Sequence, residues 1–431
     1  MRPGFHSPWI HLHPSMHRFL RHLGAAVLLV LAWVVGMPEA TSHRSGSPSF
    51  VAPRAYLPPP EDRVRIGLFE KELPRSLALA PLGGAYQVLD RDGNILDTLD
   101  SKWQIQVGGG TRDQWTQGGR TFSYAYFRPL AADSKLRIDP AGPVHPQHHP
   151  GGLHLVREGD ALRCILEVAL DEYLVGVLSA EAGKGHHPEF YEAQAIVSRT
   201  YTLTALQRHA GQGFQLCDAV HCQAYHGVAT ASEAHREAVV ATTGLVLLDR
   251  QGAPITAAFH SNCGGQTQGA ENVWQRPLPY LVGVQDTFCL AMPHCQWEKS
   301  VPMGQWEAWL RAQPGPAPVD GQFLPTGRVN DLPDARAQIR AAEVRKAFAL
   351  RSSYFVTLAQ GDSVRFIGKG FGHGVGMCQE GAMNRARHGQ SAQDILHTYY
   401  TGVRIADLKS MRLLAPAVPD SAAATEILEA P

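Results

Sequence analysis

The sequence lacks an excess of charge of either sign. Its 39 lysines and arginines balance 39 aspartates and glutamates over 431 residues. A protein that binds nucleic acid through its phosphates carries a broad positive field, which this balance does not provide. We therefore expect no nucleic-acid partner, and a neutral polymer or a small molecule fits the composition better.

Cysteine is scarce, and the N-terminal part of the chain has none. The 7 cysteines lie at 164, 217, 222, 263, 289, 295 and 378. A chain of this length buries enough apolar surface to fold without disulfides or metals. In an oxidising compartment some of these cysteines would pair, and the odd number leaves at least one outside such pairs.

Long apolar runs are also missing, apart from "LGAAVLLVLAWVVGM" at residues 23–37. This run is shorter than the roughly 20 residues that a membrane-spanning helix needs. Basic residues precede it, and small or polar residues follow it, which is the three-part pattern of an export signal. We expect residues 1–40 to be a signal peptide cleaved near Ala40, with an uncleaved signal anchor as the alternative.

The stretch "GKGFGHGVGMCQEGA" at residues 368–382 lacks the spacing of a nucleotide-binding loop, although it lies between a predicted strand and a predicted helix. Its first five glycines are spaced two residues apart, and neither dinucleotide-binding nor P-loop spacing is present. Glycine also removes side chains so that another group can approach the backbone. One interpretation is therefore a loop that receives a ligand beside His373, and the other is a tight turn with no ligand.

The remaining pattern predicts an α+β protein. Short alternating runs and an Asp-Gly turn at residues 92–93 indicate strands, whereas helical periodicity begins after Leu170. The expected organisation is a linker at 41–62, a β-rich part at 63–170, a mixed α/β part at 171–406 with a proline-rich excursion near 311–333, and a disordered tail at 407–431.

Four histidines gather in "VHPQHHPGGLH", at positions 145, 148, 149 and 154. Two prolines interrupt this group and no carboxylate is interleaved with it. We expect a solvated loop rather than a metal site.

A helix predicted to begin with Asp171 as its cap carries an apolar stripe that includes Leu174 and Leu178. Glu181 continues this stripe and should point inward at the helix C-terminus. Burial and the helix dipole both raise the pKa of such a carboxyl, as a general acid requires. The alternative is a glutamate that caps the next helix or pairs with Lys184.

Several motifs resemble, in the same order, those of the stage II sporulation protein D family, which includes the amidase-enhancer proteins. They are "EYLVGVLSAEA", "EAQAIVSRTYTLTAL", "HCQAYHG", "AFHSNCGGQT", "PYLVGVQD" and "GFGHGVGMCQEGAMNRARHGQSAQDILHTYYTGV". The resemblance covers residues 63 to about 406. It implies an exported protein of the cell-wall space, either periplasmic or extracellular, that cleaves peptidoglycan glycan strands as a lytic transglycosylase.

By this resemblance Glu181 is the catalytic general acid and base. The residues expected to bind the glycan in a groove are His221, Gln223, Tyr225, His260, Ser261, Gly264, Thr267, Gly372, His373 and Gln379. The chain departs from the family pattern where a methionine usually follows the glutamate, since Ala182 stands there. The tryptophan usual before Pro188 is also missing.

A lytic transglycosylase needs one carboxylate, whereas an ordinary glycosidase needs two. The implied reaction requires no cofactor and forms 1,6-anhydromuramic ends, and a cell-wall amidase is an expected partner. The alternative is a non-catalytic glycan-binding module that stimulates such an amidase. A zinc hydrolase is a third interpretation, but the sequence lacks a His-Glu-x-x-His motif.

Cys217, His221 and Cys222 resemble an arrangement with bound zinc in some family members, and His209 would add a fourth ligand. The alternative, which we favour, is that the two thiols form a disulfide in an oxidising compartment. Cys263 and Cys289 are the expected second pair. The other three cysteines stay unassigned.

Overall fold

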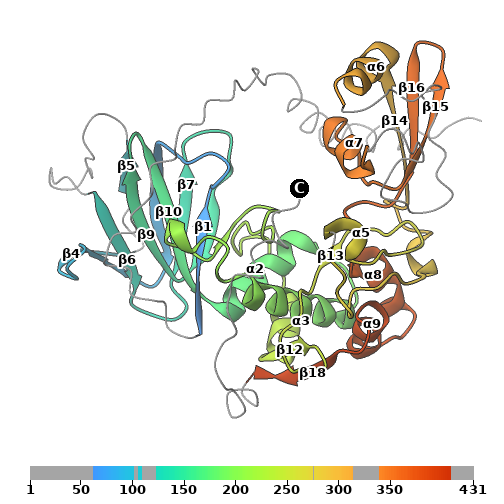
Figure 1. The fold of residues 1–431 in the computed structure, drawn as a ribbon. Helices are drawn as coiled ribbons and strands as arrows, with labels where there is room; N and C mark the ends of the chain where they lie inside the picture. Colours follow the sequence, from blue (N-terminus) through green and yellow to red (C-terminus); the bar gives the residue numbers. More distant parts are fainter. Residues whose placement is uncertain (1–61, 101–104, 109–122, 275, 314–338, 409–431) are drawn as a thin grey trace, which may run out of the picture. The chain divides into compact units, whose positions relative to one another are not determined.

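The computed structural model describes residues 62–100, 105–108, 123–274, 276–313 and 339–408 (Figure 1). These residues all belong to one compact unit, residues 51–431. The expected signal peptide, nearly all of the linker and tail, and most of the proline-rich excursion lie outside the described residues. Within the described parts, no helix is both long and apolar enough to cross a membrane.

The first part of the described chain is built of strands, which confirms the α+β class with a β-rich N-terminal region. The strands are β1 (Arg63–Leu68), β2 (Ser76–Gly83), β3 (Tyr86–Leu89), β4 (Ile95–Leu99), β5 (Ile105–Gly108), β6 (Tyr124–Pro129), β7 (Lys135–Pro140), β8 (Gln147–Pro150), β9 (Gly152–Glu158) and β10 (Ala161–Ala169).

These strands form two sheets, and β11 (Leu216–Cys217) joins the larger one. The larger sheet has the order β11-β1-β10-β9-β6-β3-β4, and the smaller has the order β5-β2-β7-β8. Their alternating side chains place Ile66 of one sheet and Ile138 of the other in the same buried apolar cluster. The Asp-Gly turn joins antiparallel β3 and β4 as predicted, and Gly93 has a φ of +85°.

Most of the histidine-rich segment is not a solvated loop, so that expectation was wrong except at His145, which is exposed and precedes β8. It forms β8 and β9, in which His149 and His154 are buried. Burial lowers the pKa of His149 to about 3, and its Nε2 lies 3.0 Å from Oε1 of Gln147. Side chains alternate between the two faces of a strand, and His149 and His154 lie on the inward faces of their strands. Polar neighbours there supply their hydrogen-bond partners.

The helices begin at the residue after β10, as the periodicity predicted. The first three are α2 (Leu170–Glu181), α3 (Pro188–Thr204) and α4 (Glu233–Ala241). The N-cap of α2 is Ala169, so the prediction that Asp171 caps this helix was wrong. Asp171 lies in the first turn instead and pairs with Arg199 of α3 at 2.9 Å, because a buried guanidinium needs an anionic partner.

Short elements complete the part of the chain that surrounds α3. They are η2 (Ala210–Gln212), β12 (Leu245–Leu248), β13 (Phe259–His260), α5 (Glu271–Trp274), η3 (Thr287–Cys289), β17 (Met377–Cys378), α8 (Gln379–Arg387), α9 (Ala392–Tyr399) and β18 (Arg404–Asp407). The parallel pair β13 and β17 joins segments more than a hundred residues apart. Ser391 caps α9 with Asp394 in a capping box.

A second apolar cluster belongs to a smaller substructure that the sequence did not predict. It consists of the sheet β14-β16-β15 with two helices, and its elements are β14 (Gln296–Pro302), α6 (Met303–Arg311), α7 (Ala341–Ala347), β15 (Phe355–Gln360) and β16 (Ser363–Lys369). Trp297, Trp306 and Phe366 are buried at its centre. The end of β16 leads directly into the glycine loop, so this substructure positions the loop.

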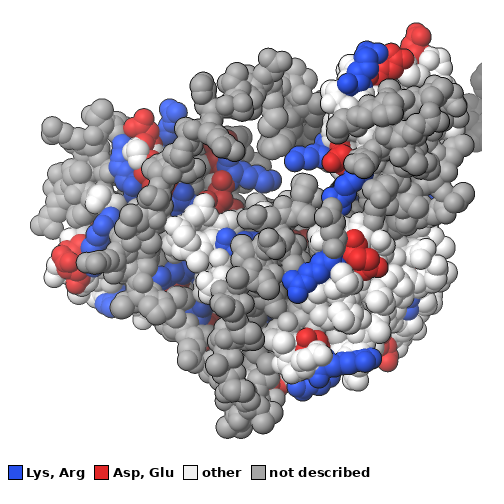
Figure 2. Space-filling model, viewed as in Figure 1, with Lys and Arg blue, Asp and Glu red and all other residues white. Residues whose placement is uncertain are grey.

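On the face shown in Figure 2, the charged side chains of the described residues are not gathered by sign. Figure 2 shows blue and red residues interspersed among white ones on the face in view. The equal totals of acidic and basic residues thus correspond to a mixed surface on this face.

Candidate active site

Glu181 is the last residue of α2, and its carboxyl is half-buried. Its Oε1 accepts a hydrogen bond of 2.6 Å from the backbone N–H of Ala224. The next helix is capped by His187, whose side chain accepts from the N–H of Glu189. Glu181 therefore does not cap α3, and Lys184 is exposed and forms no ion pair with it within the described residues.

Burial raises the pKa of Glu181 above its ordinary value of 4.5. The hydrogen bond from Ala224 acts in the opposite direction because it stabilises the ionised form. No lysine, arginine or histidine among the described residues lies close enough to this carboxyl to form an ion pair. The group is thus biased toward its protonated form, which can donate a proton.

Glu181 lines a cavity of about 610 Å³. We call this the Glu181 cavity. The expected site residues that line it, apart from Glu181 itself, are His221, His260, Ser261, Gly372, His373 and Gln379. Among the described residues that line it, Glu181 is the only carboxylate.

Two histidines stand together at the glycine-loop side of the cavity, with ring centroids 5.6 Å apart. Nδ1 of His260 lies 3.1 Å from the carbonyl oxygen of Val375, so this nitrogen carries the proton. Nδ1 of His373 accepts from the N–H of Val375 at 3.1 Å, so a neutral His373 carries its proton on Nε2. The backbone of Val375 therefore sets opposite tautomers on the two rings.

The glycine loop makes room mainly for the chain itself. A side chain at Gly370 would meet the carbonyl oxygen of Asn262, and one at Gly376 would meet that of Ala258. Both glycines also have φ values near +70°, which other residues rarely adopt. The close approach at Gly370 and Gly376 is thus by the segment around β13, whereas Gly372 lines the cavity beside His373.

Gln379 connects the start of α8 to the end of α2. Its Nε2 lies 3.3 Å from the backbone oxygen of Glu181 and 3.3 Å from Oε1 of Gln194. Gln379 is 6% exposed, so these contacts fix its amide. Gln379 thereby holds the start of α8, which follows the glycine loop, against the end of α2, which carries Glu181.

Four of the expected glycan-binding residues do not line the cavity. Gln223 is buried and its amide donates to Thr202 Oγ1 at 2.9 Å. Tyr225 packs fully buried against Gly176, which leaves no room for a larger residue there. Gly264 has a φ of +70° beside Lys369, and Thr267 Oγ1 accepts from Val284 N–H. Their positions indicate that they support the walls of the site.

Several cavity residues carried no signal in the sequence. Arg208 donates to the hydroxyl of Tyr201 at 2.7 Å and to the backbone oxygen of His221. Arg345 comes from α7 in the smaller substructure, and Trp274 ends α5 with its ring centroid 5.8 Å from that of His373. The two guanidiniums and the indole come from distant segments, so no local motif could have found them.

A group of two cysteines and two histidines lies at the edge of this cavity. Sγ of Cys222 is 3.4 Å from Nε2 of His209 and 3.6 Å from Nδ1 of His221, and Sγ of Cys217 is 3.7 Å from the same His221 atom. Their ligand atoms all lie within 4.8 Å of one another. Two thiolates and two imidazoles at such spacing are a donor set that suits tetrahedral zinc.

All the cysteines lie in described residues, and no disulfide joins any two of them. The expected bond between Cys217 and Cys222 is thus not formed in this structure. Cys263 and Cys289 do lie together, but their sulfur atoms are 3.3 Å apart, well beyond the bonded distance of about 2.05 Å.

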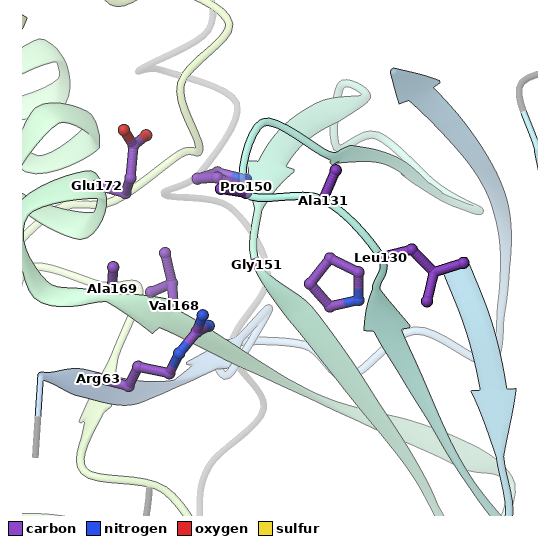
Figure 3. A pocket seen from close by; sticks show the side chains of 10 residues that line it. Arg63, Leu130, Ala131, Pro150, Gly151, Val168, Ala169 and Glu172 are labelled. Carbon is purple, nitrogen blue, oxygen red and sulfur yellow. The ribbon is translucent and has the colours of Figure 1, made fainter. Parts of the chain in front are cut away.

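A smaller cavity of about 290 Å³ lies apart from these residues. Figure 3 shows it between the ends of several strands and the start of α2, with Arg63 and Glu172 as its charged residues. Glu172 is paired with Arg236 at 3.4 Å. This cavity includes none of the expected site residues, so the Glu181 cavity is the candidate active site.

Comparisons with known proteins point to one family. A family model described as "Stage II sporulation protein" matches residues 158–248, the segment that contains α2 and Glu181. Stage II sporulation protein D of Bacillus subtilis (strain 168) is 28% identical over 267 residues, 57% of this chain and 77% of that protein. The protein of the same name from Bacillus amyloliquefaciens is 28% identical over 264 residues, 56% and 76% of the two chains. "Amidase enhancer" of Bacillus subtilis (strain 168) is 26% identical over 290 residues, 54% of this chain and 40% of that protein.

Proposed function

Because the chain belongs to the stage II sporulation protein D and amidase-enhancer family, we propose that it is an exported lytic transglycosylase that cleaves the glycan strands of peptidoglycan. The family supports a role at the cell wall. The apolar run at residues 23–37 supports export to the periplasmic or extracellular cell-wall space.

The observation that carries the proposal is the solitary carboxyl of Glu181. It faces a cavity large enough for sugar units, its pKa is raised by burial, and no second carboxylate is among the cavity's described lining residues. Inverting and retaining glycosidases need a second carboxylate as base or nucleophile. One acid is sufficient if the substrate supplies its own nucleophile.

The proposed reaction uses Glu181 twice. The protonated carboxyl gives its proton to the glycosidic oxygen as the bond from that oxygen to the anomeric carbon breaks. The resulting carboxylate then accepts the proton of the muramic acid 6-hydroxyl, whose oxygen bonds to the anomeric carbon. The product is a 1,6-anhydro end, Glu181 is protonated again, and no water is consumed.

Other cavity residues have the chemistry to hold such a substrate. Trp274 offers an apolar face, and Nε2 of His373 offers a hydrogen-bond donor beside it. Arg208 and Arg345 supply positive charge near the carboxyl groups that muramic acid units and their peptides carry. These groups position the strand and leave the proton transfers to Glu181.

Zinc is the ligand that best fits the cluster of Cys217, Cys222, His209 and His221. With four protein ligands the ion would have a structural role and would order the segment that ends at Ala224. That segment supplies the N–H bound to Glu181, so the cluster acts on the acid through its support. We favour this zinc site over a Cys217–Cys222 disulfide because four donors converge there.

A second function stays open because one relative bears the name amidase enhancer. In this reading the protein binds glycan and stimulates a cell-wall amidase without cleaving the strand. A binding module has no use for a half-buried carboxyl whose pKa is raised and which faces its groove. The substitution of Glu181 therefore separates the two functions.

Glu181→Gln keeps the size of the side chain and can still accept from Ala224, but it cannot donate and recover a proton. We expect turnover of peptide-stripped glycan to fall by roughly two to four orders of magnitude while glycan binding survives. Glu237→Gln, an exposed carboxyl of α4 outside the cavity, is the matched control and should keep full activity. Turnover of Glu181→Gln near the native rate would transfer the role of acid to another group or favour the binding function.

A further inference from the structure

Three cysteines and an aspartate from three segments of the chain meet in the interior of the protein. They are Cys263 after β13, Cys289 at the end of η3, Cys378 at the end of β17, and Asp286 at the N-cap of η3. All four are 0% exposed, and their ligand atoms lie within 4.8 Å of one another. We propose that these residues form a second, structural metal site that binds one zinc ion.

The separations among the ligand atoms suit a zinc site. Sγ of Cys263 lies 3.3 Å from Sγ of Cys289 and 3.7 Å from Oδ2 of Asp286. Bonds of about 2.3 Å in a tetrahedron place neighbouring sulfur ligands about 3.8 Å apart. Small movements of the side chains would bring the four atoms onto one ion.

Backbone amides are directed at the sulfur atoms. Gly265 N–H donates to Sγ of Cys289 at 3.2 Å, whereas Sγ of Cys378 accepts from the N–H groups of Cys263 at 3.2 Å and Gly381 at 3.3 Å. These bonds stabilise sulfur as a thiolate, the form that binds metal. A Cys263–Cys289 disulfide would use two of the four groups and leave the Cys378 sulfur with two donors aimed at it.

The surroundings also orient the carboxylate ligand. Oδ1 of Asp286 pairs with Arg385 at 3.0 Å, and Oδ2 accepts from the hydroxyl of Tyr399 at 2.7 Å. Such outer contacts fix ligating groups in metal sites. Zn²⁺ together with Arg385 would offset three of the four negative charges of three thiolates and one carboxylate, and the thiol protons would leave to solvent on binding.

The position of this cluster explains what the ion would do. Ser261 and Gln379, which line the Glu181 cavity, stand two residues before Cys263 and one residue after Cys378. The ion would tie β13, β17 and η3 together directly behind that wall. Because four protein groups fill a tetrahedral set, the site is closed and has no position for a substrate.

The first experiment measures zinc in the full exported chain with the other cluster removed. Cys217→Ser with Cys222→Ser should still carry one equivalent of zinc after purification without chelator. Cobalt substituted into this variant should show the absorption of a tetrahedral site with thiolate ligands. No bound metal in this variant, or a Cys263–Cys289 disulfide in non-reducing peptide maps of the native protein, would overturn the proposal.

The second experiment assigns the ligands. In the same background Asp286→Asn should weaken zinc binding at least tenfold, because a ligating carboxylate is lost while the thiolates remain. Cys295→Ser is the matched control, since Cys295 is buried nearby but outside the cluster, and it should leave the zinc content unchanged. Loss of zinc from Cys295→Ser but not from Asp286→Asn would contradict the assignment. If either added substitution prevents folding, the cobalt spectrum of the Cys217→Ser, Cys222→Ser protein alone tests whether a tetrahedral thiolate site is present.

Discussion

Glu167 in the sheet and Glu181 at the end of α2 lie fourteen residues apart in the chain and are both removed from solvent to a large extent. Burial acts to raise the pKa of each carboxyl. Glu167 nevertheless has a pKa lowered to about 2, because His154 and Arg65 contact it, with Arg65 at 2.8 Å. Among the described residues, the carboxyl of Glu181 has only the N–H of Ala224 as a partner, and its pKa is raised. The cationic partners, more than the burial, separate a structural carboxylate from a proton donor.

The largest expected effect is the loss of stability when Glu167 of the sheet is substituted. Glu167→Gln leaves the buried Arg65 without its counter-charge, so the free energy of unfolding should fall by about 3 kcal/mol. Glu181→Gln breaks no ion pair with any described residue and should cost no stability at neutral pH. Denaturant unfolding of the two variants at pH 7 checks this, and equal losses would remove the distinction between the two sites.

A cationic side chain placed beside Glu181 should remove the difference in pKa between Glu181 and Glu167. Gln379 contacts the backbone oxygen of Glu181 at 3.3 Å and lines the same cavity, so Gln379→Lys should bring an ammonium group within reach of the carboxyl. An opposite charge within about 4–6 Å lowers a carboxyl pKa by about 1–3 units. The protonated fraction at neutral pH, and with it turnover, should fall about tenfold or more below that of Gln379→Met, the uncharged control. A pH–rate profile should show the high-pH limb moved to lower pH in the lysine variant alone. Identical profiles for both variants would contradict the role given to the raised pKa.

A smaller effect appears in the dependence of stability on pH. The depressed pKa of Glu167 contributes stability that is present above about pH 4.5 and is lost as the pH falls toward about 2. The raised pKa of Glu181 acts with the opposite sign: its ionised form opposes folding above the folded-state pKa, and this cost is absent below about pH 4.5. The difference in unfolding free energy between native protein and Glu181→Gln should therefore favour the variant at neutral pH and vanish in acid. Unfolding series at several pH values measure it, and a difference that grows in acid would reverse the assignment.

Local pattern predicted the parts of the fold that depend on neighbours in sequence. The apolar stripe of α2 placed Glu181 at the rim of the core, and the Asp-Gly turn fixed the hairpin of β3 and β4. Pattern failed where a distant partner decides the outcome. Asp171 faces Arg199 instead of capping its helix, and His149 is buried against Gln147 in a segment rich in polar residues.

The candidate site divides in the same way. Motifs indicated Glu181, the histidines and Gln379, which the chain does bring to one cavity. Arg345 arrives there from α7, beyond the proline-rich excursion, and nothing in its own segment indicates a ligand. The meeting of Cys263 with Cys378 likewise depends on the pairing of β13 with β17, which no spacing in the sequence reveals.

The most direct test of the account is the chemical form of the product that the native protein makes. Peptide-stripped glycan is digested in water enriched in oxygen-18, and the released fragments are examined by mass spectrometry. A single acid acting on the substrate's own 6-hydroxyl predicts 1,6-anhydro ends that carry no heavy oxygen. Reducing ends labelled with oxygen-18 would mean that water is the nucleophile, and would contradict the mechanism built on Glu181 alone.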